Sequence, residues 1–217
     1  DIARSIQRSM LPRDREFASG PLRYRLHARL EPAKAVGGDF HGHFRHGDGR
    51  VWFVVGDVSD KGVPAALFMA RAVTVLEVAA TTGAAPDQVL ADAGRHLSAG
   101  NDACMFATVL CGMLDLASGE LAIASAGHDA PLLRRADGSI EPILLESGPA
   151  LGFDPGGSYE VWRGRLQPGD LLLLEGIGGR GPWPRVSPPY RHGAGEFGAD
   201  LVTSAAKIYM SAPSELT

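Results

Sequence analysis

The sequence contains only two cysteines, Cys104 and Cys111, which lie seven residues apart in one apolar segment. In an extended chain an odd separation points two side chains to opposite faces, which argues against a disulfide bond or a zinc site built from this pair. Long apolar runs are also missing, since stretches such as 51–55 and 171–174 fall far short of the roughly 20 residues that cross a bilayer. We therefore expect neither a membrane span nor a thiolate metal site.

The chain has no large excess of charge of either sign. Its 21 basic residues are set against 25 acidic ones, and no block of Lys or Arg is present that would neutralise a nucleic-acid backbone. Residues 1–11 carry charges throughout and lack the apolar core of a secretory signal. The sequence thus predicts a cytoplasmic protein with neither nucleic acid nor a membrane among its partners.

Apolar residues for a core are plentiful: 45% of the 217 residues are hydrophobic, enough for one compact domain or at most two small ones. Apolar periodicity predicts helices from Pro64 to about residue 80 and from Pro86 to about residue 97. It also suggests a short final helix, from the spacing of Leu201, Ala205 and Ile208. Strands are expected at 22–30, 36–44, 51–56, 105–114, 119–126, 131–135, 140–145, 158–166 and 170–175. This clustered order favours an α+β sandwich of antiparallel sheets over a doubly wound parallel sheet.

Residues 1–12 are predicted to form a connecting helix ahead of a main domain at 13–217. Ile2, Ile6 and Met10 share one helical stripe, which Pro12 ends. Such a stripe needs a partner, either the body of the domain or the same helix of a second chain, and we favour a dimer. Within the main domain, glycine and proline supply almost half of residues 176–198, which are expected to form a loop.

The strand expected at 22–30 alternates apolar residues with Arg23, Arg25, His27 and Arg29. Its outer face is therefore basic. That face would suit a phosphoprotein, although a solvated strand face is the simpler interpretation.

The hairpin expected around residues 36–56 places two carboxylates opposite each other. If its turn is centred near Asp48, Asp39 and Asp57 are equally distant from the centre and face each other across the two strands. Opposed carboxylates repel, so a divalent cation would stabilise the pair, and hard oxygen ligands favour magnesium or manganese. The alternative is that each aspartate caps a turn at a strand end, and spacing alone does not decide between them.

The residues around both aspartates resemble two motifs of the metal-dependent PPM (protein phosphatase 2C-like) family, in its sporulation-protein-E-like branch, which regulates sigma factors. The motifs are Ala35-Val36-Gly37-Gly38-Asp39-Phe40 and the segment from Gly56 to Leu67. Later segments match the branch in order, namely 105–108, 112–115, 125–128, 148–152 and 169–174. Even the helix at 2–12 resembles the one that connects such domains to an upstream sensor.

The resemblance implies an α-β-β-α sandwich that binds two Mn²⁺ or Mg²⁺ ions and hydrolyses phosphoserine or phosphothreonine. The substrate would be a small phosphorylated regulatory protein, such as an anti-sigma-factor antagonist. By analogy Asp39 and Asp57 are the catalytic metal ligands, with Asp57 bridging both ions, and the main-chain carbonyl of Val58 is a further ligand. No protein nucleophile would be needed, because the metals activate a water.

The chain departs from the family pattern at its C-terminal end. Ile177 stands where the family has an aspartate ligand, no terminal Asp-Asp pair follows, and Gly42 replaces the second carboxylate of the first motif. Glu175 would need a different backbone course to replace the missing ligand. Two functions therefore stay open: a metal-dependent phosphatase, or a catalytically impaired phosphatase-like module that acts through partner binding or dimerisation.

Histidines suggest two further sites. His41 and His43 alternate with Asp39 on one strand face, which suits zinc or iron, although packing or a solvated edge explains them more simply. His128 follows Ser125 by three residues, too close for a hydrolase triad without a third group, so we expect it to order a loop. Asn101 and Asp102 are read as turn residues.

Overall fold

The computed structural model describes residues 2–13, 15–20, 22–30, 37–47, 49–176 and 204–211. In chain order its elements are α1 (Ile2–Met10), β1 (Arg15–Ser19), β2 (Leu22–Leu30), β3 (Phe40–His46), β4 (Arg50–Val58), α2 (Val63–Ala80), α3 (Pro86–Ser98), β5 (Ala107–Asp115), β6 (Glu120–Ala126), β7 (Leu132–Arg134), β8 (Ile140–Pro142), β9 (Ser147–Gly148), β10 (Trp162–Arg165), β11 (Leu171–Gly176) and β12 (Ser204–Ser211).

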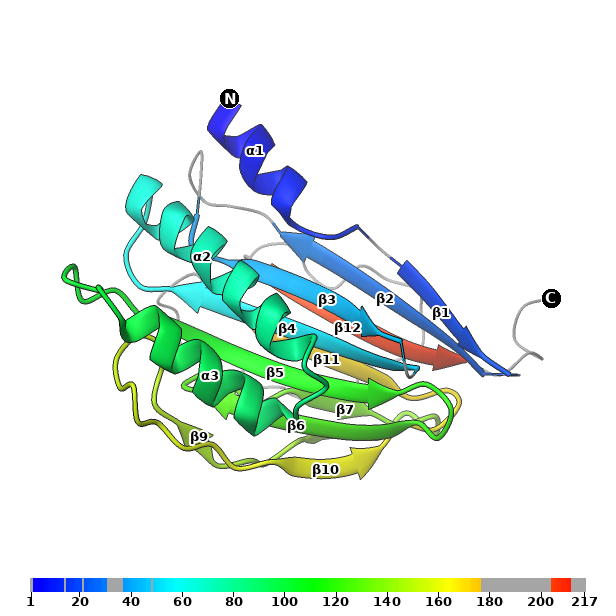
Figure 1. The fold of residues 1–217 in the computed structure, drawn as a ribbon. Helices are drawn as coiled ribbons and strands as arrows, with labels where there is room; N and C mark the ends of the chain where they lie inside the picture. The colour runs from blue at the N-terminus through cyan, green and yellow to red at the C-terminus, as the bar shows by residue number, and fades with distance from the viewer. Residues whose placement is uncertain are drawn as a thin grey trace.

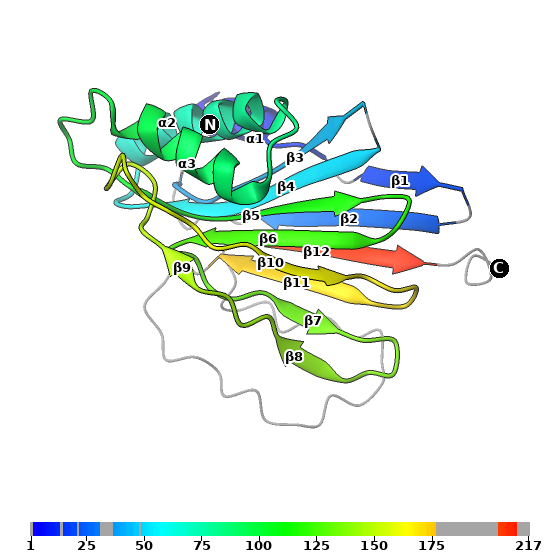
Figure 2. The ribbon, with the colours of Figure 1, turned by 60° about the horizontal axis from the view of Figure 1, so that its bottom comes forward.

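The strands form two sheets that pack face to face (Figures 1 and 2). The first sheet has the order β1-β2-β12-β11-β7-β8, and the second has the order β10-β6-β5-β4-β3, with β9 paired to β6. Among the described strands only β6 and β9 pair in parallel. The predicted α+β architecture of antiparallel sheets is confirmed.

Both long helices cover the outer face of the second sheet (Figure 2). Over the described ranges no helix covers the outer face of the first sheet, so the second helical layer of an α-β-β-α order is not seen there. The boundaries of α2 and α3 follow local chemistry. Pro64 and Pro86 occupy the first turn of each helix, where a missing N–H costs nothing, and Gly62 before α2 adopts a φ of 86°.

Strand β4 lies between two hydrophobic cores, one on each face of the second sheet. Val51, Phe53 and Val55 pack toward the first sheet, whereas Trp52 and Val54 pack toward α2 and α3. A strand covered on both faces is apolar at every position, which accounts for the continuous apolar run in the sequence. The alternation also places Asp57, two residues after Val55, on the face toward the first sheet.

Helix α2 bears on the expectation that the chain has no membrane span. By length and composition this helix is apolar enough to cross a membrane. Its buried residues recur at helical spacing and belong to the core between the second sheet and the helices, where α2 packs beside α3. A core helix of a globular domain passes the same test of length and composition, so we give α2 this packing role.

The C-terminal segment also differs from expectation, since residues 204–211 form strand β12 and not a helix. β12 pairs along its whole length with β2 and along six residues with β11, so it lies inside the first sheet. Insertion between two strands satisfies backbone donors and acceptors on both sides. This gain from long-range pairing outweighs the weak helical spacing of a few apolar residues.

The N-terminal helix and strand β2 agree with their sequence patterns. Gln7 and Leu11 are buried against the domain, while Ile6 and Met10, each one position earlier, remain 57% and 39% exposed. On β2 the side chains of Arg23 and Arg25 are exposed, and Arg25 forms an ion pair with Glu16 of β1 at 2.6 Å. The basic face of β2 is therefore solvated and partly neutralised by its neighbouring strand.

Candidate metal centre

The β3–β4 hairpin brings the two predicted carboxylates together. Residues 40–46 pair with residues 56–50, and every pair is centred on position 48. Asp39 and Asp57 occupy the next position of the same register, and a hydrogen bond joins their carboxyl groups. The prediction that the two aspartates face each other in one hairpin is therefore confirmed.

Both carboxylates lie at the end of the sandwich, on the side between the sheets. Phe40 packs into the core under the helices, so the alternation of β3 directs the preceding Asp39 the other way. Asp39 is only 7% exposed, whereas Asp57 is partly open to solvent. A ligand bound between the two would be shielded by Asp39 on one side and reachable from the other.

The electrostatics of the pair favour the binding of a cation. Burial is the largest cause that raises the pKa of Asp57, followed by the negative charge of Asp39 and the hydrogen bond between the two carboxyls; together they bring it to about 7. The Lys61 ammonium and the Val58 N–H act in the opposite direction but do not offset these effects. The pair therefore retains a proton near neutral pH unless a cation replaces it.

Two glycines let the backbone approach the site closely. A Cβ on Gly38 would meet the carbonyl oxygen of Val58 at 2.8 Å, and a Cβ on Gly56 would meet that of Thr108 at 2.6 Å. Real side chains do not tolerate such contacts, so only glycine fits at either position. The Val58 N–H donates to the Gly38 carbonyl at 3.3 Å, which fastens the start of β3 to the end of β4.

The turn between β4 and α2 is held by local hydrogen bonds. The Ser59 N–H donates to the Phe106 carbonyl at 2.7 Å, and the Phe106 N–H donates to the Ser59 hydroxyl at 2.9 Å. Asp60 takes a φ of 72°, a region that aspartate tolerates better than most residues, and its carboxylate accepts from the Lys61 N–H at 2.8 Å. These contacts hold the chain that follows Asp57 in one course.

Thr108 and His128 form a second layer behind Asp57. Thr108 pairs with Asp57 across β5 and β4, and its hydroxyl lies 3.4 Å from the Asp57 carbonyl and 3.1 Å from His128 Nδ1. The His128 N–H donates to the Ser125 hydroxyl, which in turn donates to the His128 carbonyl. The expected loop-ordering role of His128 is confirmed. Sequence reasoning assigned no role to Thr108, which only strand pairing places here.

His41 and His43 point toward the N-terminal segment. Nε2 of His41 lies 3.2 Å from the Pro12 carbonyl, and Nε2 of His43 lies 3.0 Å from the Arg13 carbonyl. Across the described ranges no group of three or more His, Cys, Asp or Glu side chains is arranged to hold a metal. The alternative of a histidine zinc or iron site is therefore not supported, and both imidazoles serve packing and backbone contacts.

The second carboxylate that Gly42 replaces would not have been a ligand at this centre. It lies on the helix-facing side of β3, where a Cβ would meet the Phe44 ring at 2.8 Å and Val54 at 3.0 Å. A carboxylate at this position would point away from Asp39.

The departure from the family pattern at Ile177 lies outside the described residues, as does the loop expected at 176–198 apart from Gly176, where β11 ends. Glu175 is described only as a backbone partner of Ala205.

The donor set suits a hard divalent cation. Two opposed carboxylates and the nearby Val58 carbonyl supply oxygen atoms alone, the preference of Mg²⁺ and Mn²⁺. A dication would also remove the repulsion that raises the pKa of Asp57. The residues present thus fit one such ion, and the Asp39–Asp57 pair is the candidate metal centre.

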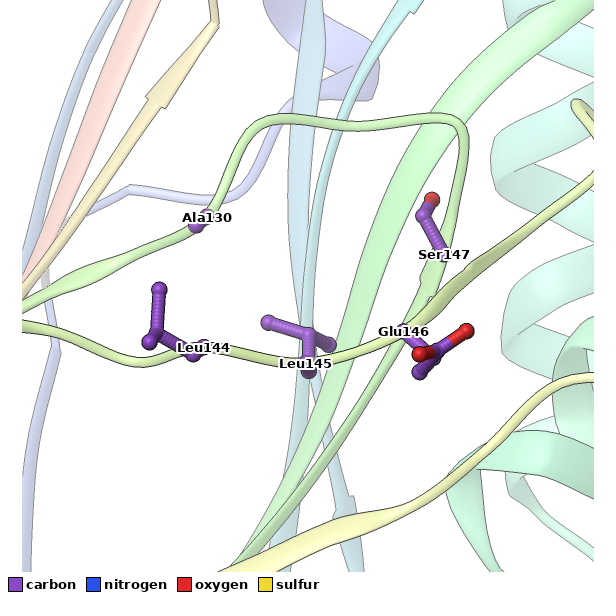
Figure 3. Close-up of a pocket in the computed structure, with 5 residues that line it drawn as sticks. All are labelled: Ala130, Leu144, Leu145, Glu146 and Ser147. Atoms are coloured by element: carbon purple, nitrogen blue, oxygen red, sulfur yellow. The ribbon is translucent and has the colours of Figure 1, made fainter.

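A separate surface hollow of about 470 Å³ is lined by Ala130, Leu144, Leu145, Glu146 and Ser147 (Figure 3). Its walls carry one carboxylate and no basic side chain, so it does not suit a phosphate group. Ser147 connects it to the His128 loop, because its hydroxyl accepts from the Gly127 N–H at 2.7 Å. We assign this hollow no catalytic role.

Comparison with known proteins supports this fold. The family described as Stage II sporulation protein E (SpoIIE) matches residues 47–175, more than half of the chain. A crystal structure of the RsbU and RsbW domains of Rv1364c from Mycobacterium tuberculosis matches with a TM-score of 0.65 and 29% identity, covering 76% of this chain and 46% of that one. The architecture is that of PPM-type phosphatase domains, and the chain belongs to the SpoIIE family.

Two curated relatives extend the comparison. Protein IcfG of Synechocystis sp. is 30% identical over 197 residues, and phosphoserine phosphatase RsbU of Bacillus subtilis is 27% identical over 178 residues. The matches cover 78% and 80% of this chain. They cover only 30% and 51% of the two relatives, so this chain corresponds to one part of each.

Proposed function

We propose that this protein is a Mn²⁺- or Mg²⁺-dependent phosphatase that hydrolyses phosphoserine or phosphothreonine on a small regulatory protein in the bacterial cytoplasm. An anti-sigma-factor antagonist is the class of substrate we favour. The observation that carries the proposal is the Asp39–Asp57 pair, opposed at the end of a SpoIIE-family sandwich. The relative named phosphoserine phosphatase RsbU supports the reaction class.

The roles of the residues follow from their placement. Asp39 and Asp57 would hold the metal through their carboxylates, with the Val58 carbonyl as a further ligand and Asp57 shared if two ions bind. The bound metal supplies an activated water and positive charge opposite the phosphoryl oxygens. Thr108 orients the Asp57 backbone, and the turn at 59–62 fixes the start of α2 beside the site. No nucleophilic side chain is required.

A second candidate is a catalytically impaired module that acts by partner binding or dimerisation. It is favoured by the small number of ligands, because within the described ranges only two carboxylates meet at the centre. Exposed Ile6 and Met10 on α1 are the surface on which such a module would pair with a second copy. In either case we propose that α1 connects the domain to an upstream sensor.

Manganese titration by calorimetry, with dephosphorylation of a phosphoserine peptide measured beside it, separates the two candidates. Binding together with metal-dependent turnover supports the phosphatase. Binding without turnover, or no binding by the folded protein, supports the impaired module. For variants of Asp39 or Asp57, Asp102→Ala is a suitable control, because it also removes an aspartate but from an exposed loop.

A further inference from the structure

Gln7 makes the most specific contact between α1 and the rest of the domain. Its side chain is only 4% exposed, and its amide forms two hydrogen bonds with the backbone of Gly37, thirty residues further along. The Gln7 Nε2 donates to the Gly37 carbonyl at 2.6 Å, and the Gly37 N–H donates to Gln7 Oε1 at 3.1 Å. One side-chain amide thus satisfies both polar groups of one residue in a shielded place.

The position of Gly37 gives this contact its meaning. Gly37 and Gly38 directly precede Asp39, and Gly38 is itself fastened to Val58 by the 3.3 Å hydrogen bond between its carbonyl and the Val58 N–H. The two glycines therefore lie between Gln7 on one side and Val58 on the other. Two consecutive glycines have more backbone freedom than any other pair, so contacts from outside must restrict them.

Helix α1 is anchored well enough to act as a fixed support. Leu11 at its end belongs to the core under the second sheet. The two residues that follow are held by the imidazoles of His41 and His43 through the carbonyls of Pro12 and Arg13. The Gln7 amide is thus carried by a helix whose C-terminal end is fastened to β3, the strand that Asp39 precedes.

We propose that Gln7 is a positioning residue of the metal centre, which restrains Gly37 and Gly38 and so sets the place of the Asp39 carboxylate. The inference rests on the proposed function, because it assumes that Asp39 binds the metal. Without the amide, the glycine pair samples conformations in which Asp39 and Asp57 do not converge. Apparent metal affinity then falls by the fraction of molecules that remain competent.

The main test is Gln7→Met, which keeps the length and apolar stem of the side chain and removes both hydrogen bonds. We expect manganese affinity, measured by calorimetry on the whole chain, to fall about tenfold. Ser9→Ala is the matched control, since the exposed Ser9 hydroxyl bonds to the Ile6 carbonyl within α1, and the affinity of this variant should equal that of the wild type. Equal affinities of wild type and Gln7→Met would overturn the proposal.

A metal-free measurement tests the contact itself. In the wild type without metal, the Gly37 amide should exchange with solvent deuterium at least about tenfold more slowly than that of Gly47, an exposed turn glycine. In Gln7→Met this protection should be lost. Equally fast exchange of the two amides in the wild type would refute the proposal, whether or not the variant folds.

The two measurements also separate this inference from the proposed function. A wild type that protects Gly37 but binds no manganese would contradict the proposed metal centre. A wild type that binds manganese and dephosphorylates the peptide, with an unprotected Gly37, would contradict only the role of Gln7.

Discussion

Two places in the described part of this chain bury an aspartate, and they surround it in opposite ways. Asp170, before β11, has a side chain only 2% exposed, and its carboxylate accepts from the N–H groups of Gln167 and Ala136 at 2.9 and 3.1 Å. It also forms an ion pair with Arg135 at 3.1 Å. At the candidate centre, by contrast, Asp57 faces a second carboxylate.

The difference teaches how to separate a structural carboxylate from a functional one. The protein surrounds Asp170 with its own donors and pairs its charge with Arg135, as a buried structural group requires. The Asp39–Asp57 pair brings like charges together and raises a pKa to about 7, an arrangement that a folded chain keeps for a ligand. All three aspartates, Asp39, Asp57 and Asp170, directly follow a glycine, so local sequence does not distinguish them.

The largest effect is expected for Asp57→Ala. If Asp57 is the metal ligand that we propose, loss of its carboxylate should lower manganese-dependent turnover of a phosphoserine peptide by more than about a hundredfold. Because Asp57 lies at the end of the sheet and is partly exposed, far-UV circular dichroism should stay unchanged. Asp102→Ala should retain full activity, and an active Asp57→Ala protein would show that this residue is not a ligand.

Asp170→Ala should have the reverse profile. Removal of this carboxylate takes from Arg135 its buried ion-pair partner, leaving it the exposed Glu141, and leaves two N–H donors without an acceptor, at a cost of about 3 kcal/mol in the free energy of unfolding. Urea unfolding measures the loss. Manganese affinity of the folded variant should match that of the wild type; if the variant instead lost metal binding with little loss of stability, the contrast between the two aspartates would fail.

Ile177→Asp tests the ligand that the family pattern expects at this position. An added carboxylate strengthens the field that holds a dication, so we expect manganese affinity to rise about tenfold, with a gain in turnover. Calorimetry on the wild type and this variant gives the answer. Equal affinities would mean that position 177 does not correspond to the family ligand.

The smallest effect concerns pH in the metal-free protein. Asp57 has a folded pKa near 7, above the unfolded value of 3.8, so between these values the folded state binds a proton that the unfolded state does not. The contribution of Asp57 to stability therefore falls as pH rises from about 4 to 7. Asp57→Asn, which resembles the protonated form, should be more stable than the wild type at pH 8.

This gain should be about 1 kcal/mol, since Asp57 is partly exposed and its repulsion is screened by solvent. It should shrink as pH falls toward 4. Thermal unfolding of both proteins in EDTA across this range provides the comparison. A difference that did not vary with pH would contradict the raised pKa.

Local chemistry was enough to predict the two long helices and the hairpin. Prolines in the first turn marked the starts of α2 and α3, and the two-residue alternation marked β2. The hairpin register followed from the turn near position 48, because the two strands of a hairpin are joined directly and their pairing is fixed by the turn. This is why the Asp39–Asp57 pairing was predictable.

Strands that depend on distant partners were not predictable in the same way. β12 was expected to be a helix, since its hydrogen bonds come from β2 and β11, which are distant from it in the sequence. β1 was not expected either, although its partner β2 follows it directly. The family motifs compensated in part, because they identified the site and the fold class before any contact was known. They also placed Gly42 among the lost carboxylates, which the face of β3 contradicts.

By itself the sequence determined the class of this protein, its central hairpin and the pair of aspartates at the hairpin's open end, because each of these is encoded in adjacent residues. Only the tertiary structure decided that Asp170 is neutralised by Arg135, that Thr108 supports Asp57, and that Gln7 holds Gly37. These contacts join residues that are 30 or more positions apart. No local pattern encodes them, because they exist only when two packed sheets and a docked helix bring the chain together.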